Sequence, residues 1–211
     1  MQKKLFLFLP GLLLAILLHA QDSTKKISNF HDAFISGYFN HLNDGSNFGM
    51  GIAGAYYKNL YVETRWNYED LQTFTLLGGY SFSNDQHNFQ WELIPMLGFA
   101  AGNTNAVIPA LKLDLSYKKL GLYSDLEYAF SVDDKSSNYF YVWSEFTYAV
   151  KDWFQPGLVA QRTRLFKTAR EIDRGFMINS NFLARLTLSG YLFDPFDKGK
   201  TFYVLGLNYA F

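Results

Sequence analysis

The chain has 211 residues, and its 19 lysines and arginines balance 19 aspartates and glutamates. A neutral chain lacks the basic excess that tracks phosphates, so we expect no nucleic-acid partner. There is no cysteine, which excludes disulfides and thiolate metal sites, and an aromatic content of 19% is far too high for a disordered chain.

The first twenty residues predict a secretory signal peptide. Lys3 and Lys4 precede an apolar run from Leu5 to Leu18, and the small residue Ala20 comes just before a polar stretch. The run is shorter than the roughly 20 residues that a membrane anchor needs. We therefore expect a signal peptide over residues 1–20, cleaved after Ala20, and a short periplasmic segment over residues 21–30.

From residue 31 onward the sequence alternates with the period of a β-strand. In the segment LYVETRWNYE, Leu60, Val62, Thr64, Trp66 and Tyr68 share one face, opposite Tyr61, Glu63, Arg65, Asn67 and Glu69. The same alternation recurs around Trp91–Phe99, Leu111–Tyr117, Leu120–Tyr128, Phe140–Tyr148 and Leu186–Leu192. Without a comparable helical stripe, the pattern predicts an all-β fold.

Polar and turn-forming residues divide this part of the chain into strands. The predicted breaks are Asn43–Asn47, Lys58–Asn59, Glu69–Gln72, Ser83–Asn88, Gly102–Asn105, Lys118–Lys119, Val132–Asn138, Lys151–Asp152, Phe166–Arg174 and Asp194–Lys200. The stretch from Gly175 to Phe193 is too long for one strand and changes phase, so we place a further turn at Asn181–Leu183. Twelve strands result.

The distribution of aromatic residues separates two all-β architectures. A soluble sandwich would place mostly aliphatic residues on its apolar faces. Here the apolar faces carry aromatics near their ends, as in the two girdles of a transmembrane barrel. The residues concerned are Tyr56, Trp66, Tyr68, Phe74, Tyr80, Phe82, Phe89, Trp91, Phe99, Tyr117, Tyr128, Phe140, Tyr148 and Phe154.

The last eleven residues, TFYVLGLNYAF, alternate with aromatic or apolar side chains and end on Phe211. This segment resembles the final strand of Gram-negative outer-membrane β-barrel proteins. The resemblance implies an antiparallel up-and-down transmembrane β-barrel over residues 31–211 with short loops, located in the outer membrane and contacting its lipids. It also implies that Tyr209 and Phe211 form the signal that the barrel-assembly machinery recognises, and that both termini and the shorter turns face the periplasm.

Function is then sought on the inward face of the barrel. Candidate channel-lining residues are Glu63, Arg65, Glu92, Lys112, Asp114, Asp125, Glu127, Glu145 and Arg185. Hairpin geometry predicts that Lys112 faces Asp125, that Asp125 faces Glu145, and that Glu92 lies near Asp114. The small residues Gly49, Gly51, Ala53 and Ala55 are expected to face inward, opposite Glu63 and Arg65.

These residues lead us to expect a narrow passive channel for small polar solutes or ions. Acids would line one wall of the channel and arginines of the C-terminal strands another. The electric field across the channel would then favour cations along the acidic wall. The arginines are Arg162, Arg164, Arg170, Arg174 and Arg185. A salt-bridged interior is the simpler interpretation of the same charges. A structural or partner-binding barrel without transport stays open as an alternative.

An enzymatic role is the weaker alternative. His41, with Asn43 and Ser46 in the first outer loop, supplies the residue types of a lipid acyl hydrolase, but nothing in the sequence fixes their geometry. We therefore name no catalytic residues and expect a channel rather than an enzyme. We also expect no cofactor and no metal.

Overall fold

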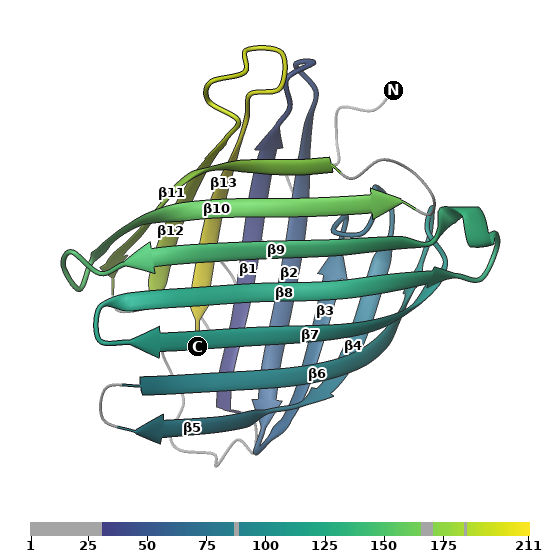
Figure 1. Ribbon diagram of the computed structural model, residues 1–211. Coiled ribbons are helices and arrows are strands. Elements are labelled where there is room, and N and C mark those ends of the chain that lie inside the picture. The colour runs from purple at the N-terminus through teal and green to yellow at the C-terminus, as the bar shows by residue number, and fades with distance from the viewer. Residues whose placement is uncertain (1–30, 87–88, 166–170, 184) are drawn as a thin grey trace, which may run out of the picture.

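A computed structural model describes residues 31–86, 89–165, 171–183 and 185–211. These residues form strands and one short 3-10 helix, η1 (Lys135–Ser137) (Figure 1). The strands are β1 (His31–His41), β2 (Asn47–Tyr57), β3 (Leu60–Trp66), β4 (Phe74–Tyr80), β5 (Phe82–Gln86), β6 (Phe89–Ala101), β7 (Ala106–Tyr117), β8 (Leu120–Ser131), β9 (Tyr139–Tyr148), β10 (Phe154–Leu165), β11 (Glu171–Leu183), β12 (Leu186–Phe193) and β13 (Phe202–Ala210). The predicted signal peptide and the segment 21–30 lie outside the described residues.

The strands form one antiparallel sheet that closes on itself, with β13 paired to β1 and β4 paired to β6. Strands β4 and β5 pair with β6 in a single continuous register, through Gly79 with Met96 and Phe82 with Leu93. They are two parts of one spanning strand, interrupted where Pro95 of β6 offers no N–H to the ladder. The barrel therefore has twelve spanning strands, which confirms the predicted fold class and strand number.

The two ends of the barrel differ in the length of their connections. One end, which we call the turn end, contains the start of β1, the end of β13 and the short turns 58–59 and 118–119. At the other, the loop end, lie residues 42–46, 67–73, 102–105, 132–138 and 194–201. Loops 42–46 and 194–201 lie side by side at the top of Figure 1, where the Asn43 side chain donates to the Gly199 carbonyl at 2.5 Å.

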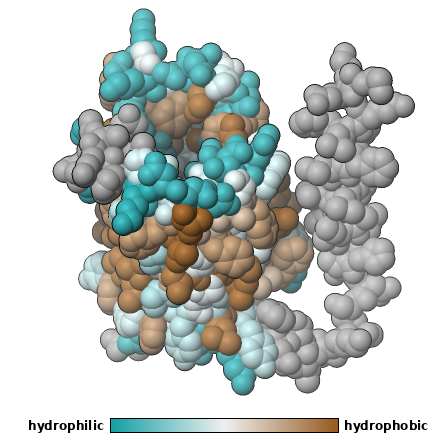
Figure 2. All heavy atoms as spheres, turned by 90° about the vertical axis from the view of Figure 1, so that its right-hand side faces the viewer, coloured by the Kyte–Doolittle hydropathy of each residue, from teal (hydrophilic) through white to brown (hydrophobic). Residues whose placement is uncertain are grey.

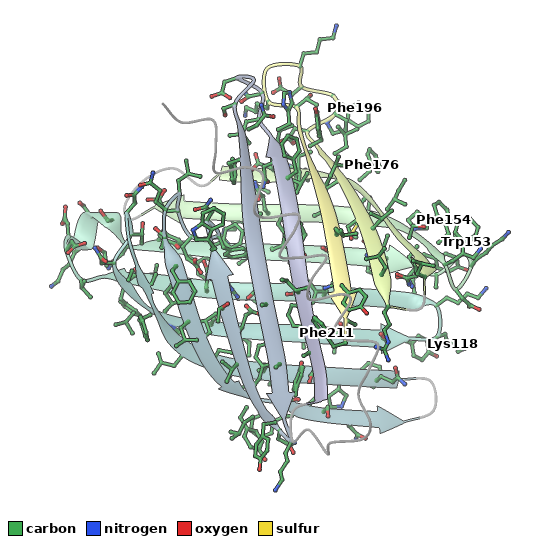
Figure 3. The ribbon with its side chains drawn as sticks, turned by 180° about the vertical axis from the view of Figure 1, so that it is seen from behind. Lys118, Trp153, Phe154, Phe176, Phe196 and Phe211 are labelled. Atoms are coloured by element: carbon green, nitrogen blue, oxygen red, sulfur yellow. The ribbon has the colours of Figure 1, made fainter. Side chains whose placement is uncertain are left out.

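The outer surface is apolar and carries aromatic residues near both ends. Figure 2 shows hydrophobic side chains gathered in a belt across one face, with hydrophilic loop residues above them. Phe176 and Phe196 project outward near the loop end, and Trp153 and Phe154 project near the turn end (Figure 3). Other outward aromatics are Phe39, Trp66, Phe74, Phe99 and Phe130 toward the loop end, and Tyr80, Phe82, Phe89, Tyr117 and Tyr148 toward the turn end.

Two predicted girdle residues instead face the interior. Tyr56 donates a hydrogen bond to the inward Glu92. The guanidinium carbon Cζ of Arg65 lies over the ring of Tyr68, 4.3 Å from the centroid of that ring. The alternation of β3 does not extend to Tyr68 because the strand ends at Trp66 and Asn67 adopts a φ of 56°, which turns the chain.

The predicted phase of β2 was wrong. The turn at 58–59 sets Ile52 opposite Arg65 and Gly54 opposite Glu63, so the even-numbered residues of β2 face inward. Gly51 and Ala53 instead lie opposite Trp66 and Thr64, on the outer face. The physical reason is that paired residues in an antiparallel ladder point to the same side, and a shift of one residue exchanges the two faces.

Three predicted breaks also differ from the structure. Strand β5 continues through Ser83 to Gln86, β11 already begins at Glu171, and β11 extends to Leu183 before β12 starts at Leu186. Polar residues marked the predicted breaks, but the ladders to the neighbouring strands supply backbone partners for these segments. Among the described residues, no helix is long and apolar enough to cross a membrane.

Candidate functional site

The lumen contains two cavities that meet near its middle. One, of about 840 Å³, opens toward the loop end and is called the loop cavity; the other, of about 590 Å³, lies toward the turn end and is called the turn cavity. Both are lined by the same five residues, which we call the collar: Tyr38 of β1, Ile52 of β2, Tyr123 of β8, Glu145 of β9 and Tyr191 of β12. The collar therefore marks the junction of the two cavities.

Beside the collar, Arg65 of β3 lies at the centre of a buried network of charges. Its Nε donates to Glu63 at 2.6 Å, while its two terminal nitrogens donate to Glu127 at 2.7 Å and to Asp125 at 2.8 Å. Glu69 lies 3.6 Å from the same guanidinium. Arg65 thus joins β3 to β8 through the interior and neutralises carboxylates that would be costly to bury alone.

Lys112 of β7 extends this network toward the turn end. Its ammonium group pairs with Glu63 and also donates to the hydroxyl of Tyr61 at 3.2 Å, and that hydroxyl in turn donates to Glu63. The space between β3 and β8 around the network is filled by apolar side chains, namely Leu77, Ile94, Met96, Ala100, Ala106, Ile108, Ala110 and Ala129. This side of the lumen is packed, and Tyr61, Ile94 and Lys112 at its border also line the turn cavity.

Glu145 of the collar is held by neutral donors. The indole nitrogen of Trp143 donates to its Oε1 at 2.8 Å, and the Tyr191 hydroxyl donates to the same atom at 2.9 Å. No lysine, arginine or histidine of the described residues forms an ion pair with it. The collar therefore presents a carboxylate whose charge no neighbouring cation neutralises.

The turn cavity is lined by further acids, by Lys112 of the network and by two lysines at its mouth. Glu92 of β6 accepts hydrogen bonds from the Ser81 hydroxyl at 2.5 Å and the Tyr56 hydroxyl at 3.2 Å. Asp114 lies directly opposite Glu92 in the β6–β7 ladder, as predicted. Lys118 and Lys119 of the β7–β8 turn line the same cavity.

The walls of the loop cavity are largely aromatic. Phe48, Tyr68, Tyr141, Trp143 and Phe202 line it in addition to the three collar tyrosines. Its polar groups include Asp173, which accepts a hydrogen bond from the Gln161 amide at 2.9 Å, and near the loop end Arg174 and Lys200. The cavity thus combines flat apolar surfaces with a few fixed polar groups, as ligand-binding cavities do.

The predicted channel-lining residues separate into three groups in the structure: those in the buried network, those on the cavity walls, and one residue in an exposed turn. Glu63, Arg65, Lys112, Asp125 and Glu127 belong to the buried network, and Lys112 faces Asp125 as predicted. Glu92, Asp114 and Glu145 line the cavities, as do Asp125 and Lys112 of the network.

Arg185, in contrast, is exposed in the β11–β12 turn and does not lie in the lumen. It falls outside the alternating part of β12, which begins at Leu186.

Two further expectations about the interior need correction. Asp125 faces Trp143 and Tyr123 faces Glu145, so the predicted Asp125–Glu145 pairing is off by two residues. The predicted arginine wall is not seen in the described part of the chain: Arg162 lies over the Phe140 ring, and Arg174 lies at the rim of the loop cavity. The side chains of Arg164 and Arg170 lie outside the described residues.

The collar tyrosines were missed by sequence reasoning. Tyr38, Tyr123 and Tyr191 come from strands that are distant in the sequence, and aromatic residues were interpreted as markers of the outer face. The available signal was phase, because Tyr123 alternates with the outward leucines Leu120, Leu122 and Leu126. The collar tyrosines could have been identified by their inward positions in the alternating pattern, but not by the number of aromatic residues in the chain.

The residues of the enzymatic alternative contact other residues rather than one another. His41 Nδ1 hydrogen-bonds with Asn47 Oδ1 at 2.7 Å and its ring stacks on Tyr203, while the Asn43 side chain donates to Gly199. Within the described segments no hydrogen bond joins His41 to Ser46, and no group of three or more His, Asp or Glu side chains could hold a metal ion.

Tyr209 and Phe211, the predicted assembly signal, lie at the turn end. Their rings are in edge contact with centroids 5.1 Å apart, and the Phe211 amide donates to the Ala33 carbonyl at 2.8 Å. Phe211 is about half exposed (Figure 3). Recognition by the assembly machinery stays a prediction.

Comparison with solved structures finds porins. The chain is similar to a KdgM porin, with a TM-score of 0.62 and 13% identity over 84% of this chain and 99% of that one; the same porin has been solved in complex with disordered oligogalacturonate. It is also similar to a NanC porin, with a TM-score of 0.57 and 10% identity over 85% and 98% of the two chains. No protein-family model matches the sequence, and neither does any curated protein sequence. At these identities the likeness establishes the barrel fold.

Proposed function

We propose that the protein is a narrow passive channel for small polar solutes in the outer membrane of a Gram-negative bacterium. The observation that carries this proposal is the pair of cavities that meet at the collar inside a closed barrel. The likeness to porin folds supports it. Small polar solutes would enter through one cavity, pass the collar and leave through the other.

In the proposed orientation the turn end faces the periplasm and the loop end faces outward. Short periplasmic turns and longer external loops are usual in outer-membrane barrels. The apolar belt and the two aromatic girdles support burial in lipid, with the rings at the boundaries of the hydrocarbon. The signal peptide and the Tyr209–Phe211 assembly signal belong to the same proposal.

The lumen favours cations and neutral solutes over anions. Glu92, Asp114 and Glu145 line the cavities without an ion pair to a described cation, whereas Arg65 pairs with Asp125 and Lys112, which lines the turn cavity, pairs with Glu63. Carboxylates without an ion-pair partner raise the local concentration of cations along a pore. An oligogalacturonate carries a carboxylate on each sugar, so we do not extend to this chain the ligand seen with the KdgM porin.

Conductance of the refolded protein in planar bilayers with symmetric KCl tests the proposal. We expect discrete open levels, and we expect Tyr38→Ala to raise the open-channel conductance because it removes one ring from the collar. Tyr80→Ala is the matched control, since Tyr80 is exposed on the outer face and should leave conductance unchanged. Absence of any open level at several voltages, in wild type and Tyr38→Ala alike, would contradict the channel.

A structural barrel without transport is the second candidate. The observation that favours it is the packed region between β3 and β8, where the Arg65 network and the surrounding apolar side chains occupy part of the lumen. The same bilayer experiment separates the two candidates, because a barrel of this kind would remain silent after Tyr38→Ala.

A further inference from the structure

We propose that the collar is a binding site for small alkylammonium cations, with Glu145 as the counter-charge and the surrounding rings as cation–π partners. The inference rests on the proposed channel and names the class of solute recognised where its two cavities meet. It is carried by three features of the collar: the carboxylate, the aromatic walls, and the charges around them.

The Glu145 carboxylate is fixed in position and has no cationic partner among the described side chains. Both of its hydrogen bonds, from Trp143 and Tyr191, end on Oε1 and come from neutral groups. The neutral donors orient the carboxylate without supplying a positive charge. A cation that reaches the collar can therefore form the ion pair that the described side chains do not.

The rings around this carboxylate are held rigidly. Trp143 is in edge contact with Tyr191 and with Phe193, with centroids 5.2 and 5.5 Å apart, and Phe193 stacks on Phe202 at 4.5 Å. Tyr123 lies directly opposite Glu145 in the β8–β9 ladder, where facing side chains are neighbours. Pre-arranged aromatic faces around a carboxylate are the features that bind quaternary ammonium groups.

The charges nearby disfavour an anion and give a cation an advantage over a neutral sugar. Asp125, which lines the loop cavity, already pairs with Arg65, and Lys112 pairs with Glu63, so both cations of the network are engaged. A neutral sugar could stack on the same rings, but it would gain nothing from the charge of Glu145. The charge of the ligand is therefore the property to test.

The test uses Trp143 as an optical reporter in the intact chain, refolded in a non-ionic detergent. Trp66→Phe, Trp91→Phe and Trp153→Phe leave Trp143 as the only tryptophan in the protein. Because its indole donates to Glu145, we expect choline to change its fluorescence in a saturable manner. Glu145→Gln, which keeps the shape but removes the charge, should weaken choline binding about tenfold or more.

The matched control is Glu92→Gln. In the described part of the chain Glu92 also accepts hydrogen bonds only from hydroxyl groups, and it lines the turn cavity without belonging to the collar, so the same loss of charge there should leave choline affinity within about twofold. Circular dichroism shows whether each variant folds. If Glu145→Gln does not fold, choline binding is measured with Glu145→Asp, which retains the charge.

The outcomes separate this site from the channel itself. No saturable response, an unchanged choline affinity in Glu145→Gln, or an equal response to glucose that survives that substitution would overturn the site. Fluorescence needs no current, so binding without conductance would contradict only the proposed channel. Conductance without choline binding would contradict only the collar site.

Discussion

Arg65 determines whether the acidic interior of this barrel can be buried. Its guanidinium donates to Glu63, Asp125 and Glu127 at once, and it is only 1% exposed. Five N–H donors in a fixed plane suit arginine to this role better than lysine. The network therefore holds β3 to β8 through the lumen and fills the space around Arg65.

Replacing Arg65 should destabilise the barrel strongly. Arg65→Ala leaves three buried carboxylates without their shared cation, and we expect a loss of about 3–5 kcal/mol in the free energy of unfolding. Urea titration of the refolded protein in lipid vesicles measures this loss. Arg185→Ala is the control, because Arg185 is exposed in a turn and its loss should change stability by about 0.5 kcal/mol or less. Equal effects of the two substitutions would show that the network carries no stability.

In a strand, alternation predicts the inward face only when one face is apolar and the other is polar. In β8, leucines alternate with polar residues, and the structure places Asp125 and Glu127 on the inward face as predicted. In β2 the small residues Gly51 and Ala53 alternate with apolar ones, so neither face identifies itself. Its phase follows from the turn at 58–59 and the pairing with β3.

Close approach of β4 and β6 makes one glycine essential to their pairing. A Cβ on Gly98 would lie 2.0 Å from the carbonyl oxygen of Leu76, whereas a Cβ on Gly78 would meet nothing within 4 Å. We expect Gly98→Ala to destabilise the barrel by about 1–3 kcal/mol, since backbone must shift to make room.

Gly78→Ala, on the neighbouring strand, should be neutral or stabilising by up to about 1 kcal/mol. Urea unfolding of the two variants measures both effects. The opposite order of stability would contradict the close approach of the two strands.

At the scale of the whole molecule, the closed barrel could be predicted from sequence and the collar could not. Alternation and turn residues act locally, and closure follows because an open edge in hydrocarbon would leave backbone groups unpaired. The collar combines side chains from β1, β2, β8, β9 and β12, so its composition depends on every register between them. Pairings across one turn, such as Lys112 with Asp125, were predictable; the Arg65 contacts to β8 through the lumen were not.

Carboxylates line the lumen from the turn cavity to the loop cavity, together with Lys112, which pairs with Glu63. Asp114 and Glu92 line the turn cavity, Glu145 lies at the collar, and Asp173 lines the loop cavity. Lys118, Lys119, Arg174 and Lys200 lie toward the two ends, where solvent and salt screen them more strongly. We therefore predict that the inner part of the lumen sets the preference of the channel for cations or anions.

The reversal potential in a planar bilayer with a KCl gradient, kept below about 0.1 M so that screening is weak, tests this central claim most directly. We predict an open channel whose reversal potential has the sign of potassium preference and moves toward zero in Glu145→Gln. A reversal potential with the sign of chloride preference would contradict it.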